Sequence, residues 1–176
     1  MNWCIASVTD FTEAELTAVY ETMSSSRKAH IDRFRHAGAR KQSLAAEALL
    51  RRLLGTDAVM ERLPSGQPVL ADSSAFISIA HCDDYVVCAV NDKPIGIDIE
   101  RVKPVKPGMA EKVCTAEELA YVQNNDVRFF EVWTAKEACF KMLGTGITDF
   151  QTVNTLSLPR KVFRQGEYMI QLVYEE

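Results

Sequence analysis

The pattern of apolar and polar positions predicts a strand at the start of the chain, followed by a long helical region. Apolar residues recur at alternating positions over residues 3–8, as expected for a half-buried strand. A helical pattern continues from there to residue 54, and Gly55 is a natural residue at which to end it. The apolar positions that approximate one face of its last helix are Leu44, Ala48, Leu50 and Leu53.

The next part of the chain has the pattern of strands. The apolar runs 75–81 and 85–90 predict two strands joined by a tight turn, and residues 93–100 predict a third strand. The turn residues of "LPSGQP" (63–68) separate these strands from the helical region.

Helices return in the second half. Thr115, with Glu118 three residues later, has the spacing of a capping box at a helix N-terminus. A further helix is expected over residues 133–143, where "WTAKEACFKMLG" ends in a glycine. Two short strands are expected near residues 152–158 and 168–174.

A weak internal repeat indicates that the chain consists of two related halves. Residues 45–53 ("AAEALLRRL") align with residues 135–143 ("AKEACFKML") at an offset of 90, although chance similarity is the alternative. We therefore predict an α+β fold with α/β-like halves, 1–92 and 93–176, related by a pseudo-two-fold axis, with the active site in the cleft between them. At this offset the second half is short at its C-terminus and lacks a counterpart of the strand at 85–90.

Composition adds an expected location. The chain is 47% apolar, so it can bury a core by itself. It contains no run of about 18 apolar residues, and its start lacks the basic and apolar regions of a signal peptide. Five cysteines, none in a C-x-x-C spacing, support neither a disulfide framework nor a zinc site. We expect a cytoplasmic protein that does not enter a membrane.

Charge is unevenly distributed along the chain. The net charge is -4, yet residues 27–52 hold eight basic and only two acidic residues. A basic block inside an acidic protein suits a compact polyanion such as a phosphorylated cofactor, and a solvated basic helix face is the alternative. Nucleic acid is not expected as a partner, because the whole chain is acidic and aromatic residues are not interleaved with the basic ones.

Two carboxylates on one strand are the main chemical signal. In "GIDIE" (96–100), Asp98 and Glu100 are two residues apart, so both point to one face, while Ile97 and Ile99 point to the other. Two acids on a largely apolar strand are unfavourable unless a positive group neutralises them. A divalent cation such as Mg²⁺, which prefers oxygen ligands, would do so, and a wet sheet edge is the alternative.

The helix at 133–143 carries further charged groups. Glu137 and Lys141 are four residues apart and share a helix face, an arrangement that is often only surface decoration. In combination with the strand carboxylates, Glu137 could be a third metal ligand, and Lys136 and Lys141 could lie near a bound phosphate. His81, at the end of a strand, could donate to a phosphate oxygen or be a core histidine.

These residues carry a resemblance. "GIDIE" followed by "WTAKEACFKMLGTGI" resembles the signature pair of the 4'-phosphopantetheinyl transferases, specifically the Sfp-type, pseudo-dimeric branch. The basic segment 31–54, the turn "SGQP" and the strand "ISIAH" also resemble that family. The resemblance implies Mg²⁺-dependent transfer of the phosphopantetheine arm of coenzyme A to a serine of an apo acyl or peptidyl carrier protein, with release of adenosine 3',5'-bisphosphate. Two halves in one chain favour a monomer.

The resemblance also implies roles for particular residues. The metal ligands would be Asp98, Glu100 and Glu137. The diphosphate would contact Lys141 and His81, with Lys136 in the same motif, and the 3'-phosphate would contact Arg27, Lys28 and Arg40. In the mechanism that we expect from these assignments, Glu137 is the first candidate to accept the proton of the serine, directly or through water, and Glu118 is the second; Lys141 would stabilise charge in the transition state.

Departures from the family pattern keep other functions open. Gln67 stands before Pro68 where the family has Gly-Lys-Pro, so this turn would contact the cofactor with one cation fewer. Ala80 and Cys82 flank His81 where the family commonly has serines. A metal-dependent hydrolase of nucleotide diphosphates and a non-catalytic module that binds coenzyme A or a carrier remain the alternatives.

Overall fold

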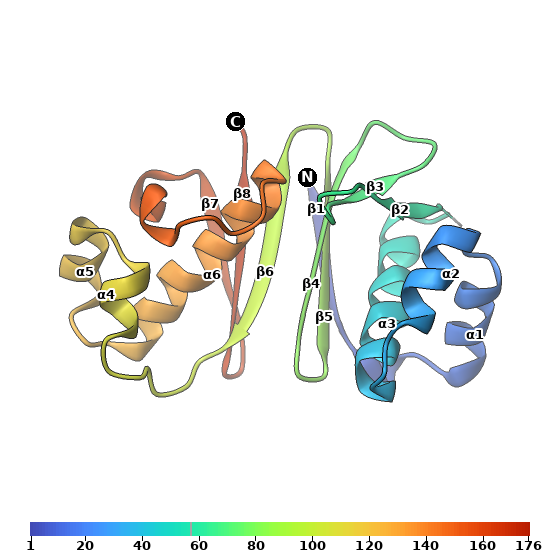
Figure 1. Ribbon diagram of the computed structural model, residues 1–176, viewed down its shortest axis with the longest axis horizontal. Coiled ribbons are helices and arrows are strands. Elements are labelled where there is room, and N and C mark those ends of the chain that lie inside the picture. The colour runs from blue at the N-terminus through green and yellow to red at the C-terminus, as the bar shows by residue number, and fades with distance from the viewer. Residues whose placement is uncertain (57) are drawn as a thin grey trace.

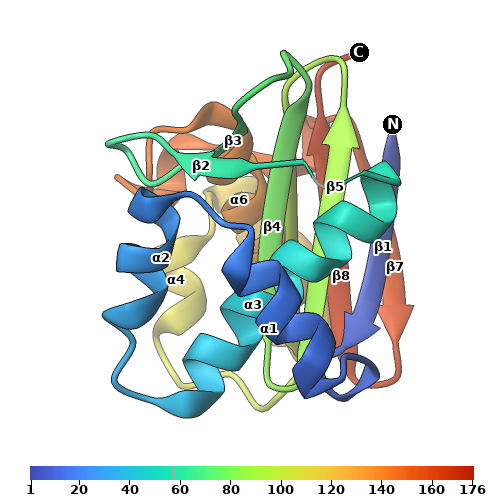
Figure 2. The ribbon, with the colours of Figure 1, turned by 90° about the vertical axis from the view of Figure 1, so that its right-hand side faces the viewer.

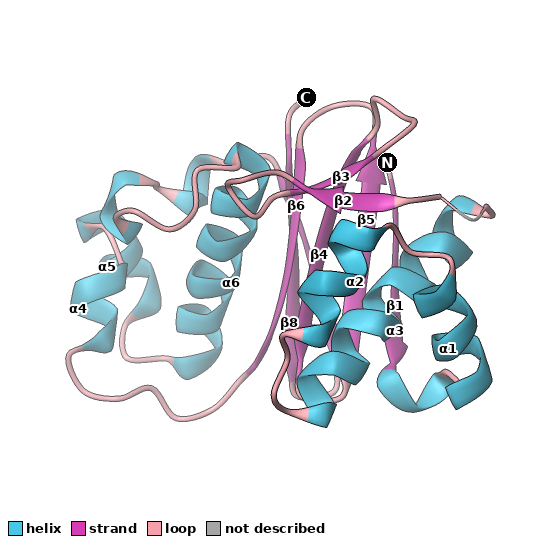
Figure 3. Ribbon diagram, turned by 45° about the vertical axis from the view of Figure 1, so that its right-hand side comes forward, coloured by secondary structure: helices cyan, strands magenta, loops and turns pink. Residues whose placement is uncertain are grey.

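Two antiparallel sheets of three strands each form the centre of the molecule. The computed structural model describes residues 1–56 and 58–176. The first sheet has the order β1-β5-β4 and the second has the order β6-β8-β7. A helical layer covers the outer side of each sheet (Figures 1 and 3). The predicted α+β class is confirmed. Within the described ranges, no helix is both long and apolar enough to cross a bilayer.

The N-terminal half contributes the first sheet and the helices in front of it in Figure 2. Its elements are β1 (Asn2–Ser7), a 3₁₀ helix (Val8–Asp10), α1 (Glu13–Glu21), α2 (Ser25–Asp32), α3 (Ala37–Leu54), the small hairpin of β2 (Met60–Arg62) and β3 (Pro68–Leu70), β4 (Phe76–Cys82) and β5 (Tyr85–Asn91). Gly55 ends α3 in the left-handed conformation, as its place in the sequence predicts.

The C-terminal half contributes the second sheet and the other helical layer. Its elements are β6 (Ile95–Arg101), α4 (Met109–Val113), α5 (Ala116–Val122), α6 (Asp126–Leu143), two 3₁₀ helices (Phe150–Thr152 and Thr155–Ser157), β7 (Arg160–Gln165) and β8 (Tyr168–Tyr174). The capping box predicted at Thr115 is confirmed, because Thr115 and Glu118 each bond the other's backbone N–H.

One predicted strand is wrong and one hairpin was not predicted. Residues 152–157 fall in and between the two 3₁₀ helices, and Leu158 follows the second one, because the side chains of Asp149 and Asn154 cap these helices instead of leaving the chain extended. The strand β7 follows them, and its mostly exposed residues lack a clear apolar alternation. The hairpin of β2 and β3 is too short to produce a periodic signal.

The strand predicted over residues 168–174 is confirmed as β8. It pairs with both β6 and β7, as β5 pairs with both β1 and β4. The connection from α6 to β7 (144–159) is shorter than the connection from α3 to β4 (55–75), so β8 comes earlier in the chain than the offset predicts.

An apolar cluster joins the two sheets. It combines Ala80, Val87 and Ala89 from the first sheet with buried aliphatic residues of the second: Ile95, Ile97, Ile99, Ile170 and Leu172. Between the neighbouring strands β4 and β6, the backbone N–H of Ile97 donates to Ser78 Oγ at 3.0 Å. Burial of the isoleucine face of β6 between the sheets leaves its other face to meet α6.

The helix α6 packs directly onto β6 at Gly96. A Cβ atom built on Gly96 would lie 1.8 Å from the carbonyl oxygen of Ala138 and 2.9 Å from the backbone nitrogen of Met142. No side chain therefore fits between the strand and the helix at this point, and the glycine sets the distance between the two elements.

We expect Gly96→Ala to lower the free energy of unfolding by about 3 kcal/mol or more, because α6 must move away from β6 to admit a methyl group. Chemical denaturation followed by circular dichroism measures this. Gly38→Ala is the matched control, since a Cβ there meets nothing within 4 Å, and we expect stability to be unchanged or raised by up to about 1 kcal/mol. Equal stability of the two variants would contradict the packing argument.

Candidate active site

The carboxylates of β6 face α6, as their spacing predicts. Asp98 is 5% exposed, and its Oδ1 accepts a hydrogen bond from Lys141 Nζ at 2.6 Å. Glu100 is half-buried, and its Oε1 accepts from Trp133 Nε1 at 3.2 Å. Both partners lie on α6, whereas Ile97 and Ile99 lie in the apolar cluster between the sheets. One face of β6 therefore packs in the apolar cluster, and the other presents its carboxylates to α6.

Glu137 completes a group of three nearby acids. Burial raises the pKa of Glu137 to about 7; the negative charges of Asp98 and Glu100 contribute, and Lys141 opposes them. Burial also raises the pKa of Asp98, against the effect of Lys141, and burial and Asp98 raise the pKa of Glu100. The acids thus lie close enough to repel one another in a partly dry setting, and Lys141 is the cation among them.

The carboxylates of Asp98, Glu100 and Glu137 are suitable ligands for a hard divalent cation, but they are not arranged as a complete metal site. Asp98 Oδ2 is buried without a hydrogen-bond partner, so one carboxylate oxygen is still available. Carboxylate oxygens completed by water and substrate phosphate are the usual ligands of Mg²⁺. Over residues 1–56 and 58–176, however, no three His, Cys, Asp or Glu side chains converge on one point as in a formed metal site.

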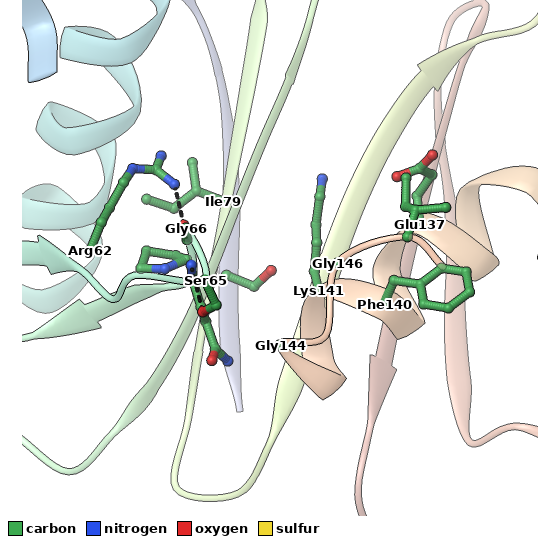
Figure 4. Close-up of a pocket in the computed structure, with 13 residues that line it drawn as sticks. Arg62, Ser65, Gly66, Ile79, Glu137, Phe140, Lys141, Gly144 and Gly146 are labelled. Carbon is green, nitrogen blue, oxygen red and sulfur yellow. Dashed lines mark hydrogen bonds between the residues drawn. The ribbon is translucent and has the colours of Figure 1, made fainter. Parts of the chain in front are cut away.

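A first cavity opens beside these acids, between the two halves (Figure 4). It has a volume of about 310 Å³. One wall comes from the hairpin of β2 and β3 with Arg62, Gln67 and Pro68, and the opposite wall comes from α6 with Glu137 and Lys141. Gly144, which ends α6 with a φ of +67°, lies against the Gln67 side chain, because a Cβ there would be 2.4 Å from Gln67 Oε1.

A second cavity of about 270 Å³ has four basic side chains in its lining, beside apolar ones. Its basic residues are Arg27, Arg62, His81 and Lys141, and its described lining holds no carboxylate. Arg62, Ile79 and Lys141 line both cavities, so the two spaces adjoin. Loss of water around the His81 ring lowers the pKa of His81, and the charge of Lys141 lowers it further. This surface is suited to an anion.

The guanidinium group of Arg27 has hydrogen-bond partners at two of its nitrogen atoms and none at the third. It is 2% exposed; its Nε donates to Glu47 Oε2 at 3.0 Å, and its Nη2 donates to Ser43 Oγ at 2.9 Å. Glu47 is shared with Arg51 at 3.3 Å, so one buried carboxylate faces two guanidinium groups. Arg27 Nη1 is buried without a partner. An unpaired buried donor on an excess of positive charge favours an incoming anion.

Lys136 and Glu118 lie elsewhere, which does not support their predicted roles at the cofactor. Both side chains are 0% exposed and form an ion pair at 2.7 Å. Lys136 Nζ also donates to the carbonyl oxygens of Phe150 and Val153, and Glu118 accepts from Thr155 as well as from Thr115. Burial acts to raise the pKa of Glu118, but these hydrogen bonds outweigh it and lower the pKa. All their bonding capacity is used to join α5, α6 and the 3₁₀ segment.

Lys28 and Arg40 also lie outside the two cavities. Both approach the ring of Tyr20, with Lys28 Nζ at 5.7 Å and Arg40 Cζ at 4.9 Å from its centroid. Arg40 pairs with Asp32 at 3.7 Å, and Lys28 Nζ donates to the carbonyl oxygen of Glu21. Of the predicted 3'-phosphate contacts, the structure brings Arg27 alone to the cavities it describes.

Arg62 is a site residue that sequence reasoning missed. It ends β2, its Nη1 donates to the carbonyl oxygen of Gly66 at 2.6 Å, and it lines both cavities. The available signal was a basic residue just before the "SGQP" turn, but without the hairpin there was no reason to direct that residue to the site.

Comparisons with known proteins give one consistent answer. A family model described as the 4'-phosphopantetheinyl transferase superfamily matches residues 94–172. The chain is 31% identical over 139 residues to 4'-phosphopantetheinyl transferase psf-1 of Bacillus pumilus, covering 72% of this chain and 60% of that protein. It is 33% identical over 118 residues to 4'-phosphopantetheinyl transferase gsp of Aneurinibacillus migulanus, covering 60% and 49%. To 4'-phosphopantetheinyl transferase Sfp of Bacillus subtilis it is 26% identical, covering 72% and 62%. The alignments thus span about half to under two thirds of these relatives.

We expect Lys136→Met to lower the free energy of unfolding by about 3 to 5 kcal/mol, because it leaves the buried carboxylate of Glu118 without its cation. Urea denaturation measures this. Lys112→Met, on the exposed surface of α4, is the control and should change stability by less than about 0.5 kcal/mol. A Lys136 variant as stable as wild type would contradict the structural role of this ion pair.

Proposed function

Because this chain belongs to the 4'-phosphopantetheinyl transferase superfamily, we propose that it transfers the 4'-phosphopantetheine arm of coenzyme A to a serine of an apo carrier protein. The reaction would depend on Mg²⁺ and would release adenosine 3',5'-bisphosphate. Its carrier would be an acyl or peptidyl carrier protein.

The observation that carries this proposal is the meeting of two kinds of surface at Lys141. On one side lies a cavity lined by basic residues and without a carboxylate among its described lining residues. On the other side lie the acids Asp98, Glu100 and Glu137. A substrate with several phosphates suits the basic side, and a diphosphate that shares a divalent cation with the acids suits the junction.

The matching order of the two sheets supports a pseudo-two-fold relation between the halves. In each half the first strand pairs with the last strand, which also pairs with the middle one, and a long helix, α3 or α6, lies between the first and middle strands in the chain. The proposed active site is the cleft between these halves, with both walls taken from one chain. A monomer is therefore sufficient as the active unit.

The metal would be held by Asp98, Glu100 and Glu137. When bound, Mg²⁺ supplies neutralisation of the diphosphate charge. Lys141, at 2.6 Å from Asp98 in this structure, would turn to the phosphate oxygens as the acids gain their cation. His81 and Arg62 would bind phosphate from the opposite wall, and Arg27 would bind through its free Nη1.

The chemical step is attack by the serine hydroxyl on the phosphorus that bears pantetheine. The new bond is between the serine oxygen and phosphorus, and the bond that breaks joins this phosphorus to the oxygen of the departing nucleotide. Glu137, which lines the first cavity, would accept the serine proton directly or through water. Glu118 lines neither cavity, so we give it a structural role. Lys141 would stabilise the charge that grows on the departing phosphate.

Exposed basic side chains of this protein would attract the carrier protein. Carrier domains tend to be acidic around their serine, so the basic residues of α2 and α3 are candidates to attract them. Lys28 and Arg40, which lie outside the two cavities, are available for this role as well as for the 3'-phosphate.

The direct test is intact mass spectrometry of several apo carriers after incubation with this protein, coenzyme A and Mg²⁺. We expect the mass of one phosphopantetheine arm to be gained, and we expect EDTA to prevent the gain. Asp98→Asn and Glu137→Gln should each lower the rate of transfer about a hundredfold or more while thermal unfolding stays that of a folded protein. Activity within a few-fold of wild type in both variants would remove the metal assignment.

Other outcomes decide between the alternatives. Cleavage of coenzyme A with every carrier unmodified would identify a hydrolase. Binding of coenzyme A without any turnover would identify a non-catalytic binding module.

We expect Arg27→Met to raise the dissociation constant for coenzyme A about tenfold or more, because a hydrogen bond to a charged group is worth about 1.5 to 3 kcal/mol. Isothermal titration calorimetry measures this. The fold should persist, since Arg51 still pairs with Glu47. Arg164→Met, on the exposed strand β7, is the control and should bind as wild type. Equal affinities of the two variants would exclude Arg27 from the binding site.

A further inference from the structure

Gln171, in the middle of β8, is a buried amide without partners. Its side chain is 0% exposed, and neither Nε2 nor Oε1 has a hydrogen-bond partner in the described part of the chain. Buried amides are nearly always hydrogen-bonded, because an unpaired one loses the bonds that it made to water. A leucine would fill similar space without this loss, so packing alone does not explain a glutamine here.

A second unpaired group lies directly across the sheet. Asp98 on β6 is the register partner of Gln171, and Asp98 Oδ2 is also buried without a partner. Side chains at directly paired positions of antiparallel strands point to the same face, with Cβ atoms about 5 Å apart. That face is covered by α6, which lies against the strand at Gly96 and reaches Asp98 Oδ1 through Lys141. The amide and the carboxylate oxygen therefore lie on the same covered face of the sheet, away from bulk water.

The two groups match chemically. The amide Nε2 has N–H groups to donate, and Asp98 Oδ2 has a lone pair that can accept one of them. From this juxtaposition we infer that Gln171 is a positioning residue for Asp98, whose carboxylate it holds at Oδ2 directly or through one buried water. Because the amide is neutral, it orients the carboxylate without cancelling its charge. Lys141 at Oδ1 does neutralise that charge, and Lys141 can leave Asp98 to bind a phosphate instead.

This inference rests on the proposed function where it assigns Asp98 to the metal. Its consequence is that Asp98 keeps its orientation when Lys141 turns away. The Oδ1 atom that Lys141 releases would then be available to a cation without a change of the Asp98 rotamer. Groups that orient metal ligands in this way commonly contribute ten- to a hundredfold to metal affinity.

The test is equilibrium binding of Mn²⁺ alone to the full chain, followed by electron paramagnetic resonance, with no coenzyme A or carrier present. Mn²⁺ prefers the same oxygen ligands as Mg²⁺. We expect Gln171→Leu to raise the dissociation constant about ten- to a hundredfold. Its melting temperature should stay equal to that of wild type or rise, because an unpaired polar group has been removed. Met169→Leu is the matched control, since it lies on the same strand and face, opposite Glu100; its Mn²⁺ affinity should be unchanged.

Wild-type Mn²⁺ affinity in Gln171→Leu would overturn the inference, and so would an equal loss in Met169→Leu. If Gln171→Leu does not fold, a high-resolution crystal structure of the wild type decides: a direct or one-water contact from Nε2 to Asp98 Oδ2 supports the inference, and an amide turned away from Asp98 overturns it. Failure of the proposed function is distinguishable. A wild type that binds Mn²⁺ but modifies no carrier would remove the transferase and leave the role of Gln171, whereas a wild type without Mn²⁺ binding would overturn the inference itself.

Discussion

The direct contact of α6 with β6 at Gly96 is the constraint on which the site depends. Two residues of a strand advance about 6.6 Å, whereas the eight residues from Trp133 to Lys141 advance about 12 Å along the helix, so these two side chains must lean toward each other to reach Glu100 and Asp98, which requires the helix to lie close to the strand. Glu137 thus lies midway along α6 between Trp133, which bonds Glu100, and Lys141, which bonds Asp98. A wider separation of strand and helix would break both contacts at once.

Some buried charged residues of this molecule join structural elements, and others are available to a ligand. The two groups differ in whether all their polar atoms have hydrogen-bond partners. Lys136 and Glu118 are both 0% exposed and saturated with partners, so their pair acts as a fastening between elements. Arg27 and Asp98 are nearly as buried, yet each retains one atom without a partner. Since burial costs these groups the water they had, an incoming ligand that restores the missing bond gains more than it would at an exposed side chain.

Sequence reasoning succeeded where a local pattern determines the answer. The alternation of "GIDIE" correctly directed Asp98 and Glu100 to one face, and the capping box at Thr115 correctly marked the start of α5. It did not separate neighbours on α6: Lys136 and Lys141 belong to one motif, but they point to different sides of the helix, and only the packing of the 3₁₀ segment captures Lys136. Arg62 was out of reach, because its position depends on a hairpin of three-residue strands folded back over the second half.

The side chain of Gln67 packs against Gly144, and this contact joins the two halves beside the first cavity. Gly144 ends α6 in a left-handed conformation, and the same missing Cβ makes room for the amide of Gln67. One glycine therefore serves both as the end of a helix and as part of the contact between two loops far apart in the chain. A Cβ at position 144 would meet only the flexible end of the Gln67 side chain, which can move aside, but the positive φ of residue 144 would still favour glycine, so the end of the helix constrains this position more strongly than the contact does.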